Sequence, residues 1–159
     1  MILVHTTKYT DGVFDLFAIG DITYDIFLTL NEARVRRVPH QHKAYLEIEY
    51  KDKVPVNTFA TDVGGSATNT AVGVSRLGFH VGLYAVHGDD AAGMFVRKKL
   101  RAEHVDDRMV EEEKGGQTNT SVILVHESER TILPYYVPRT YKLSELPKAR
   151  WMYLTTGGK

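Results

Sequence analysis

Gly64 and Gly65, followed by Asn69, are the residues of this sequence best suited to bind a small polar ligand. The two glycines have no side chains, so a ligand can come close to their peptide groups. Asn69 is expected in the first turn of a helix, where its amide can both donate and accept hydrogen bonds. The free N–H groups at the start of that helix add further donors. This combination suits a polyhydroxylated ligand, although a plain strand–turn–helix junction with packing glycines would have the same pattern.

Several other kinds of site are excluded by residue type and spacing. No Gly-Lys-Ser/Thr follows the glycines and the G-x-G-x-x-G spacing is missing, so the segment is neither a Walker loop nor a dinucleotide fingerprint. The sequence has no cysteine, which excludes disulfides, thiolate zinc sites and cysteine nucleophiles. Its seven histidines match no zinc spacing, so we expect no metal site. A formal net charge of zero argues against nucleic acid or an anionic membrane as a partner.

The segments before the glycines have the periodicity of strands. Apolar runs over Asp15–Gly20 and Asp25–Leu30 predict two strands, and the basic, polar residues 31–43 are typical of a surface loop. The alternation over Ala44–Tyr50 predicts a strand with one buried face, and a further strand is expected over Val56–Asp62. The residues expected on the buried face are Ala44, Leu46, Ile48 and Tyr50.

After the glycines the apolar period becomes that of a helix. Ala67, Ala71 and Val74 fall on one helical face, Ser66 can cap the start, and Gly78 is placed at the end.

A second helix is expected to begin at Asp89 or Asp90, which can cap it. The strands expected around and after it are Val81–Val86, Arg108–Glu113, Ser121–His126, Thr131–Val137 and Trp151–Leu154. Strands that alternate with helices predict an α/β fold, with a mainly parallel sheet flanked by helices. A small β-sheet is expected apart from the main core.

The glycine-rich segment resembles the first signature of the ribokinase-like (PfkB-type) carbohydrate kinases. The matching positions are Gly64, Gly65, Ala67, Asn69, Ala71, Gly78 and Gly88. The flanking sequence agrees, since GDITYD ends in an aspartate at Asp25 that resembles the family's sugar-binding aspartate. HGDDAAG resembles the start of the family's next helix, and the following strand pair has Thr118 and Arg130 at recurring positions. The resemblance extends from about residue 15 to residue 158.

The resemblance implies that residues 1–159 form the amino-terminal part of a ribokinase-like domain, with lid strands at about 31–62. Asp25 would accept hydrogen bonds from the hydroxyls of a sugar or nucleoside, although a turn aspartate is the alternative. Gly64 and Gly65 would lie against the ligand, and Asn69 would bind another hydroxyl. The lid would close over the ligand and could pair with a second subunit in a homodimer.

Members of the family transfer the γ-phosphoryl group of ATP to a hydroxymethyl group, usually with magnesium. Their base and anion hole come from a later G-A-G-D segment, which does not occur here. We therefore expect no catalytic residue in this chain, which alone would be inactive, and we expect ATP and Mg²⁺ to serve the complete enzyme. Such a chain would be a gene fragment, a truncated reading frame or half of a split enzyme.

The alternative is a non-catalytic sugar-binding or dimerisation module. The sequence does not distinguish ribose, fructose, sugar acids or nucleosides as substrate. Because it contains neither a signal-peptide pattern nor a long apolar run, we expect a cytoplasmic protein.

Overall fold

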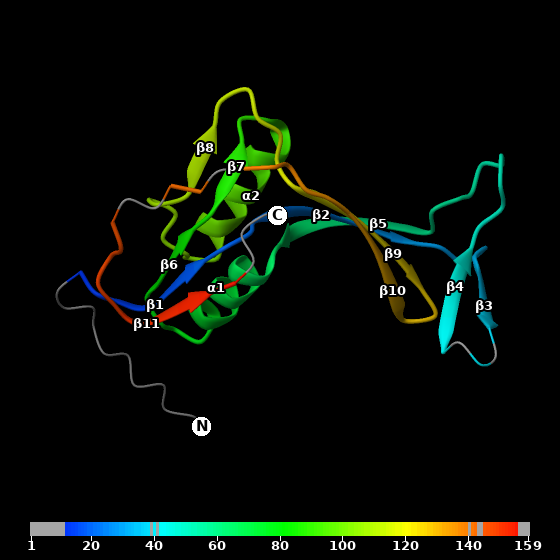
Figure 1. Cartoon of the computed structure of the whole chain (residues 1–159), viewed down its shortest axis with the longest axis horizontal. Helices are drawn as coiled ribbons and strands as arrows, with labels where there is room; N and C mark the ends of the chain where they lie inside the picture. The colour runs from blue at the N-terminus through cyan, green and yellow to red at the C-terminus, as the bar shows by residue number, and fades with distance from the viewer. Residues whose placement is uncertain (1–11, 39, 41, 140, 143–144, 156–159) are drawn as a thin grey trace.

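The computed structural model describes residues 12–38, 40, 42–139, 141–142 and 145–155. It is elongated, with an α/β body at one end and an extended β-sheet at the other (Figure 1). The predicted α/β class is therefore confirmed, and the parallel sheet lies in the body.

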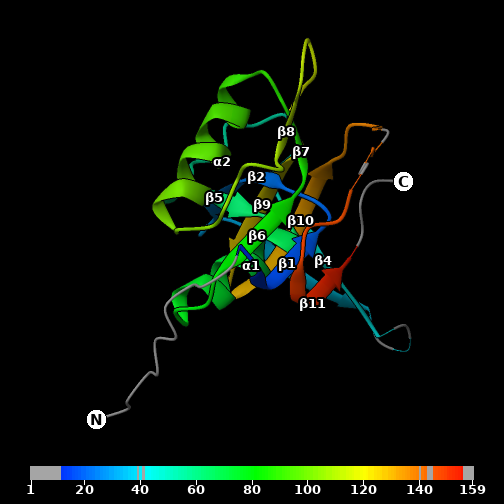
Figure 2. The same cartoon turned by 90° about the vertical axis from the view of Figure 1, so that its left-hand side faces the viewer.

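The body is built on a three-stranded parallel sheet in the order β11–β1–β6. Its strands are β1 (Phe14–Ile19), β6 (Val81–Tyr84) and β11 (Ala149–Leu154). The helices α1 (Ser66–Arg76) and α2 (Ala91–Ala102) contribute to one core cluster with β1 and β6. Viewed from the body end, β11 forms the edge of the sheet farther from the helices (Figure 2).

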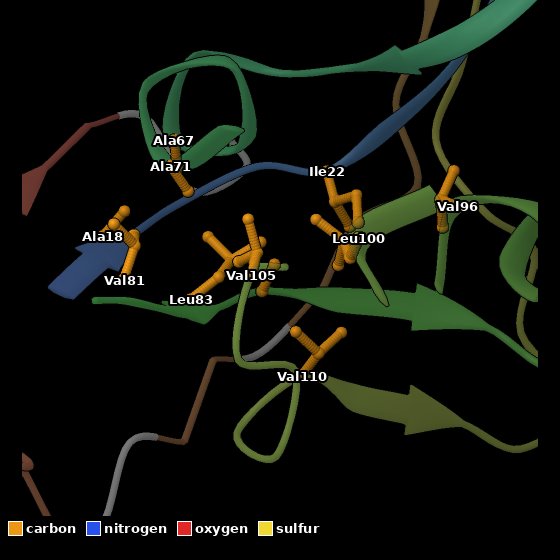
Figure 3. Close-up of a cluster of buried hydrophobic side chains, with 11 residues drawn as sticks. Ala18, Ile22, Ala67, Ala71, Val81, Leu83, Val96, Leu100, Val105 and Val110 are labelled. Atoms are coloured by element: carbon orange, nitrogen blue, oxygen red, sulfur yellow. The ribbon is translucent and has the colours of Figure 1, made fainter. Parts of the chain in front are cut away.

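The main core consists of small and branched apolar side chains, as the predicted helical stripes require. Ala67 and Ala71 of α1 are fully buried, as are Val96 and Leu100 of α2 (Figure 3). β1 also contributes to a separate cluster. That cluster consists of Phe14, Phe17, Tyr84 and Val86.

Two short parallel strands extend the body. They are β7 (Val86–Gly88) and β8 (Glu111–Glu113). The single strand predicted over Val81–Val86 is thus divided into β6 and β7, while only the last three residues of the strand predicted over Arg108–Glu113 form β8.

The extended sheet has four strands in the order β10–β9–β2–β5. They are β2 (Thr23–Thr29), β5 (Thr58–Gly64), β9 (Thr120–His126) and β10 (Glu129–Tyr135). β2 pairs with β5 in antiparallel and with β9 in parallel orientation, and β9 and β10 form an antiparallel hairpin. The sheet is therefore mixed, and it includes strands outside the range 31–62 expected for the lid.

The prediction of a loop over residues 31–43 is wrong. Residues Arg34–Val38 form β3, which pairs with β4 (Lys43–Glu47) in a two-stranded ribbon at the far end of the molecule (Figure 1). The three arginines of β3 are tolerated because they are exposed to solvent, and one of them also contacts the partner strand. Arg36 forms an ion pair with Glu47, and its guanidinium lies 4.7 Å from the centroid of the Tyr45 ring.

The buried face predicted for Ala44–Tyr50 is also absent. β4 ends at Glu47, and the side chains of Ile48 and Tyr50 are 50% and 84% exposed. The alternation is present, but Ile48 and Tyr50 lie beyond the end of β4, and Ala44 and Leu46 line a cavity between the ribbon and the β9–β10 hairpin. No helix within the described residues is long and apolar enough to span a membrane.

Candidate functional site

A cavity of about 440 Å³ lies between the start of α1 and one face of the four-stranded sheet. Three of the residues predicted to bind ligand, Asp25, Gly65 and Asn69, line this cavity. The fourth, Gly64, lies directly against the Asp25 carboxylate. The structure therefore brings together the four residues that the sequence singled out.

Asp25 lies on β2 and presents a half-buried carboxylate to the cavity. Thr23 Oγ1 donates a hydrogen bond to Asp25 Oδ1 over 2.7 Å, and Ser121 provides a second hydrogen bond. Burial raises the pKa of Asp25 above its ordinary value, and the nearby Asp62 carboxylate acts in the same direction, while the two hydroxyls act against them. Asp25 can act as a charged acceptor for ligand hydroxyls.

The two glycines are required by close approaches of the main chain. A Cβ atom on Gly64 would overlap the carboxylate of Asp25. Gly65 has a φ of 98°, a conformation that favours glycine, and a Cβ atom there would overlap the carbonyl oxygen of Asp21. Only residues without side chains allow the strand to turn into the helix this close to β2.

The expected capping role of Ser66 is wrong. The residue at the helix N-cap is Gly65, no side chain makes a capping hydrogen bond, and Ser66 is already the first residue of α1. The chain turns into the helix at Gly65 itself. No residue lies between Gly65 and α1, and Gly65 has no side chain that could act as a cap.

Asn69 lies one turn into α1, where its backbone N–H donates a hydrogen bond to the Gly65 carbonyl oxygen over 2.8 Å. Its side chain is exposed and lines the cavity. The helix start is fixed to the segment between β1 and β2, because the buried Thr68 Oγ1 donates to the Asp21 carbonyl oxygen over 3.1 Å. Asn69 can therefore offer a donor and an acceptor to a ligand from a fixed position.

Asp21 is 7% exposed and also lines the cavity. Tyr141 Oη donates a hydrogen bond to its Oδ1 over 3.0 Å. Burial and the adjacent Asp21 carboxylate raise the pKa of Tyr141 well above its ordinary value. This hydrogen bond connects Tyr141, which precedes β11, with the turn between β1 and β2, just before the strand that carries Asp25.

Asp62, Ser121 and Arg130 are among the polar residues at the cavity that were not identified as site residues from the sequence. Asp62 is directly opposite Asp25 in the register of β2 and β5, and Ser121 is opposite it in the register of β2 and β9. Arg130 reaches the cavity from β10. For Asp62 there was a usable signal, because the strand period of two places it on the same face as Gly64.

The carboxylate of Asp62 also forms an ion pair with α2. Lys99 Nζ lies 3.1 Å from Asp62 Oδ1, and both side chains are partly exposed. The ammonium group reduces the repulsion between Asp62 and Asp25 that two adjacent carboxylates would otherwise have.

Asp90 and Thr118 belong to the helix cap and not to the cavity. Asp90 Oδ1 accepts hydrogen bonds from the Gly93 N–H over 2.8 Å and from Thr118 Oγ1 over 2.6 Å. Its Oδ2 accepts from the Thr118 N–H over 2.9 Å. Although burial acts to raise it, these hydrogen bonds lower the pKa of Asp90 below its ordinary value. The prediction that Asp90 caps α2 is confirmed.

The described residues contain no group of three or more histidine or acidic side chains arranged to hold a metal ion. Asp21, Asp25 and Asp62 all line the cavity but do not form such a group. These three carboxylates therefore do not form a metal site made of protein side chains alone.

Comparisons with known proteins agree on one family. The model of the pfkB family of carbohydrate kinases matches residues 29–155. The chain is 33% identical over 85 residues to a 5-dehydro-2-deoxygluconokinase from Photobacterium profundum, an alignment that covers 53% of this chain and 26% of that protein. It is 27% identical over 122 residues to an ATP-dependent 6-phosphofructokinase from Thermoanaerobacterium thermosaccharolyticum, covering 77% of this chain and 34% of the relative.

Solved structures agree on the fold. The structure of Arabidopsis thaliana ribokinase complexed with ribose and ATP matches with a TM-score of 0.60 at 18% identity, covering 77% of this chain and 36% of that chain. The present chain thus spans about a quarter to a third of the length of the two curated relatives, 26% and 34%.

Proposed function

Because this chain belongs to the pfkB family of carbohydrate kinases, we propose that it supplies the substrate-binding part of an ATP-dependent carbohydrate or nucleoside kinase. The complete enzyme would phosphorylate a hydroxymethyl group of its substrate. The observation that carries this proposal is that Asp25, Gly65 and Asn69 line one cavity, with Gly64 packed against the Asp25 carboxylate.

In this proposal each residue has a role that follows from its chemistry. Asp25 accepts hydrogen bonds from ligand hydroxyls, and its fixed contact with Thr23 holds the carboxylate in one orientation. Asn69 donates to or accepts from another hydroxyl, and the bare peptide groups at Gly65 let the sugar ring approach the start of α1. These groups bind and orient the substrate and transfer no proton.

The phosphoryl transfer itself requires residues outside this chain. Residues 1–159 contain no G-A-G-D segment, so the family's base and anion hole have no counterpart here. ATP would supply the phosphoryl group, in line with the Arabidopsis thaliana ribokinase structure, which contains ribose and ATP. Mg²⁺ would accompany the nucleotide, and we assign it no ligand in this chain. We accordingly propose that the chain alone has no kinase activity.

A non-catalytic binding or dimerisation module remains the second candidate, and exposed apolar side chains favour it. Phe59, on the edge strand β5, is 69% exposed, and Leu133 on β10 is 53% exposed. Tyr50, beyond β4, is 84% exposed. Exposed apolar groups of this size are common at protein interfaces, so the sheet could pair with a second copy of the chain.

Calorimetric titration of the chain with ribose, fructose, gluconate and adenosine tests the binding part of the proposal. We expect at least one of these ligands to bind, and we expect Asp25→Asn or Asn69→Ala to weaken that binding. Asp89→Asn is a suitable control, because Asp89 bonds the Gly115 N–H away from the cavity. Wild-type binding that neither cavity substitution changes would exclude the cavity as the sugar site.

A phosphotransferase assay with ATP, Mg²⁺ and the same ligands tests the catalytic part. No turnover is expected from this chain. Turnover by the chain alone would disprove the proposed division between binding and catalysis. A binding module and a kinase fragment are separated by adding the carboxyl-terminal part of a family member: only the kinase fragment would gain turnover.

A further inference from the structure

We propose that Arg130 recognises an anionic group on the substrate, so that the ligand of this cavity is a sugar bearing a carboxylate or phosphate at the end remote from Asp25. This inference rests on the proposed function and names the substrate class of the same site.

The strand registers divide the face of the four-stranded sheet into rows. One row is polar and contains Asp62, Asp25 and Ser121, which are in register across β5, β2 and β9. The next row toward the far end of the sheet is apolar, and Phe27, Ile123 and Ile132 from this row line the cavity. The row after that ends in Arg130 on β10, paired with Val125. Because side chains two residues apart share a face, all three rows point to the same side.

The cavity therefore has an acidic end and a basic end. Arg130 is the one basic residue among the described residues that line it, while Asp21, Asp25 and Asp62 lie toward the other end. A ligand with an anionic terminus would be repelled from the carboxylates and attracted to the guanidinium. The charges alone thus fix which way such a ligand lies along the sheet.

The guanidinium of Arg130 is available for a ligand. The side chain is exposed, and it forms no hydrogen bond or ion pair with any residue that the structure describes. Lys99, which is paired with Asp62, is by contrast already engaged in an ion pair. An unpaired guanidinium presents two parallel N–H donors, which match the oxygens of a carboxylate or a phosphate.

The distance between the acidic and the basic end of the cavity suits the carbon chain of a sugar. Asp25 and Arg130 lie two strands apart and four residues apart along the sheet, which corresponds to roughly 10 Å across and 13 Å along the strands between Cα atoms. Both side chains reach into the cavity and shorten this gap. The apolar row between them offers no hydrogen-bonding side chain and can pack against the carbon skeleton of the ligand.

Matched pairs of ligands test the inference. D-gluconate and D-glucitol differ by a carboxylate in place of a hydroxymethyl group, and fructose 6-phosphate and fructose differ by the phosphate. Calorimetric titration of the 159-residue chain should give tighter binding for at least one anionic member than for its neutral partner. The first pair tests recognition of a carboxylate and the second tests recognition of a phosphate, so the results show which of the two anionic groups the site prefers.

Substitution of Arg130 tests whether this residue causes the difference in affinity between the anionic and the neutral ligand. Arg130→Gln should raise the Kd of the preferred anionic ligand by about tenfold or more, as expected for a lost charge-assisted hydrogen bond, and leave the neutral partner almost unchanged. Arg130→Lys should bind the anionic ligand more tightly than Arg130→Gln and less tightly than wild type, because lysine keeps the positive charge but lacks the two parallel N–H donors. Arg34→Gln removes the same charge from an exposed position on β3 that does not line the cavity, and should change neither Kd.

The outcomes separate this inference from the proposed function. If a neutral sugar binds as tightly as its anionic partner and Arg130→Gln has no effect, the role of Arg130 is wrong and the sugar site stands. An equal loss of affinity for both members in Arg130→Gln also overturns anion recognition, since it indicates damage to the cavity. If no member of either pair binds, the sugar-binding function itself is wrong, and this inference fails with it.

Discussion

Asp25 and Asp62 lie directly opposite each other in the register of the antiparallel strands β2 and β5, so the sheet holds two carboxylates side by side in the lining of the cavity. Like charges in this position destabilise a sheet, and Asp62 contributes to the raised pKa of Asp25. The ion pair between Asp62 and Lys99 offsets part of this repulsion. Groups that reduce stability in this way are common where a protein binds a ligand.

Asp25→Asn should weaken sugar binding while making the free protein slightly more stable. The folded-state pKa of Asp25 is raised, so the stability that its protonated form provides is present below the ordinary pKa and is lost as pH rises through the raised value. At neutral pH the amide avoids this loss. We expect a gain of less than about 1 kcal/mol in the free energy of unfolding, because solvent screens a half-buried group.

Urea denaturation of wild type and Asp25→Asn at pH 7 and near pH 3.5 measures this effect. The difference between the two proteins should shrink at the lower pH, because that pH lies below the ordinary pKa of 3.8 and the pKa of Asp25 in the folded protein is raised above it. A destabilised Asp25→Asn at pH 7 would show that the ionised carboxylate stabilises the fold, contrary to the direction of its pKa.

Gly64→Ala should reduce ligand affinity by displacing the Asp25 carboxylate. The new Cβ atom would overlap that carboxylate, so Asp25 must leave its hydrogen bond with Thr23 or the strand β5 must move. The expected effects are a loss of about 1–3 kcal/mol of stability, as for other overpacked positions, and at least a tenfold loss of affinity. Titration and urea denaturation measure the two.

Gly73→Ala is the matched control for this substitution. Gly73 lies within α1, and a Cβ atom there would meet nothing within 4 Å. Alanine is favoured over glycine in a helix, so Gly73→Ala should stabilise the protein by about 0.5–1 kcal/mol and leave binding unchanged. Equal effects of the two alanines on affinity would exclude a specific contact at Gly64.

Asp90→Ala should destabilise the protein by about 1–2 kcal/mol, because it removes the cap of α2 and the two hydrogen bonds from Thr118. The folded-state pKa of Asp90 is lowered, so its stabilisation is present above the ordinary pKa of 3.8 and is lost as pH falls toward the lowered value.

Thermal unfolding of wild type and Asp90→Ala between pH 3 and pH 7 measures this loss. The two proteins should become more alike at the acidic end of the range. Asp89→Ala removes a single exposed hydrogen bond to Gly115 and should have a smaller effect. A difference between wild type and Asp90→Ala that does not depend on pH would contradict the assignment.

The edge strand β11 should drive self-association of the chain. Among the described strands it pairs only with β1, and Trp151 and Leu154 on it are 74% and 75% exposed. An open strand edge with exposed apolar side chains favours pairing with another chain. Leu154→Lys should shift the protein toward monomer in sedimentation velocity experiments.

Met94→Lys is the control for this prediction, because Met94 is 66% exposed on α2, away from the sheet edge. It should leave the association state of wild type unchanged. A wild-type chain that sediments as a monomer and unfolds in one cooperative step would contradict the prediction.

The local features of the site could be predicted from sequence because they depend on residues close together in the chain. The helical period at Ala67 and Ala71, the glycine after α1 at Gly78 and the cap at Asp90 all appear in the structure as expected. The cavity shared by Asp25 and Asn69 was expected from the resemblance to the carbohydrate kinases, and the structure places both side chains in it.

Tertiary structure decided the features that depend on strand pairing. The charges of residues 34–38 indicated a loop, yet they form β3 because β4 supplies partners for them. The alternation over residues 44–50 predicted a buried face, yet β4 ends at Glu47, and Ile48 and Tyr50 beyond it are 50% and 84% exposed.

The sequence by itself determined the strand–glycine–helix segment and singled out the residues that we propose bind ligand, since backbone conformation and hydrogen-bonding capacity belong to each residue and its near neighbours. Only the tertiary structure placed Asp62 beside Asp25 and brought Arg130 to the other end of the same cavity. Those neighbours are set by the registers of β2 with β5 and β9, and a shift of one residue in either register would turn the side chains to the opposite face.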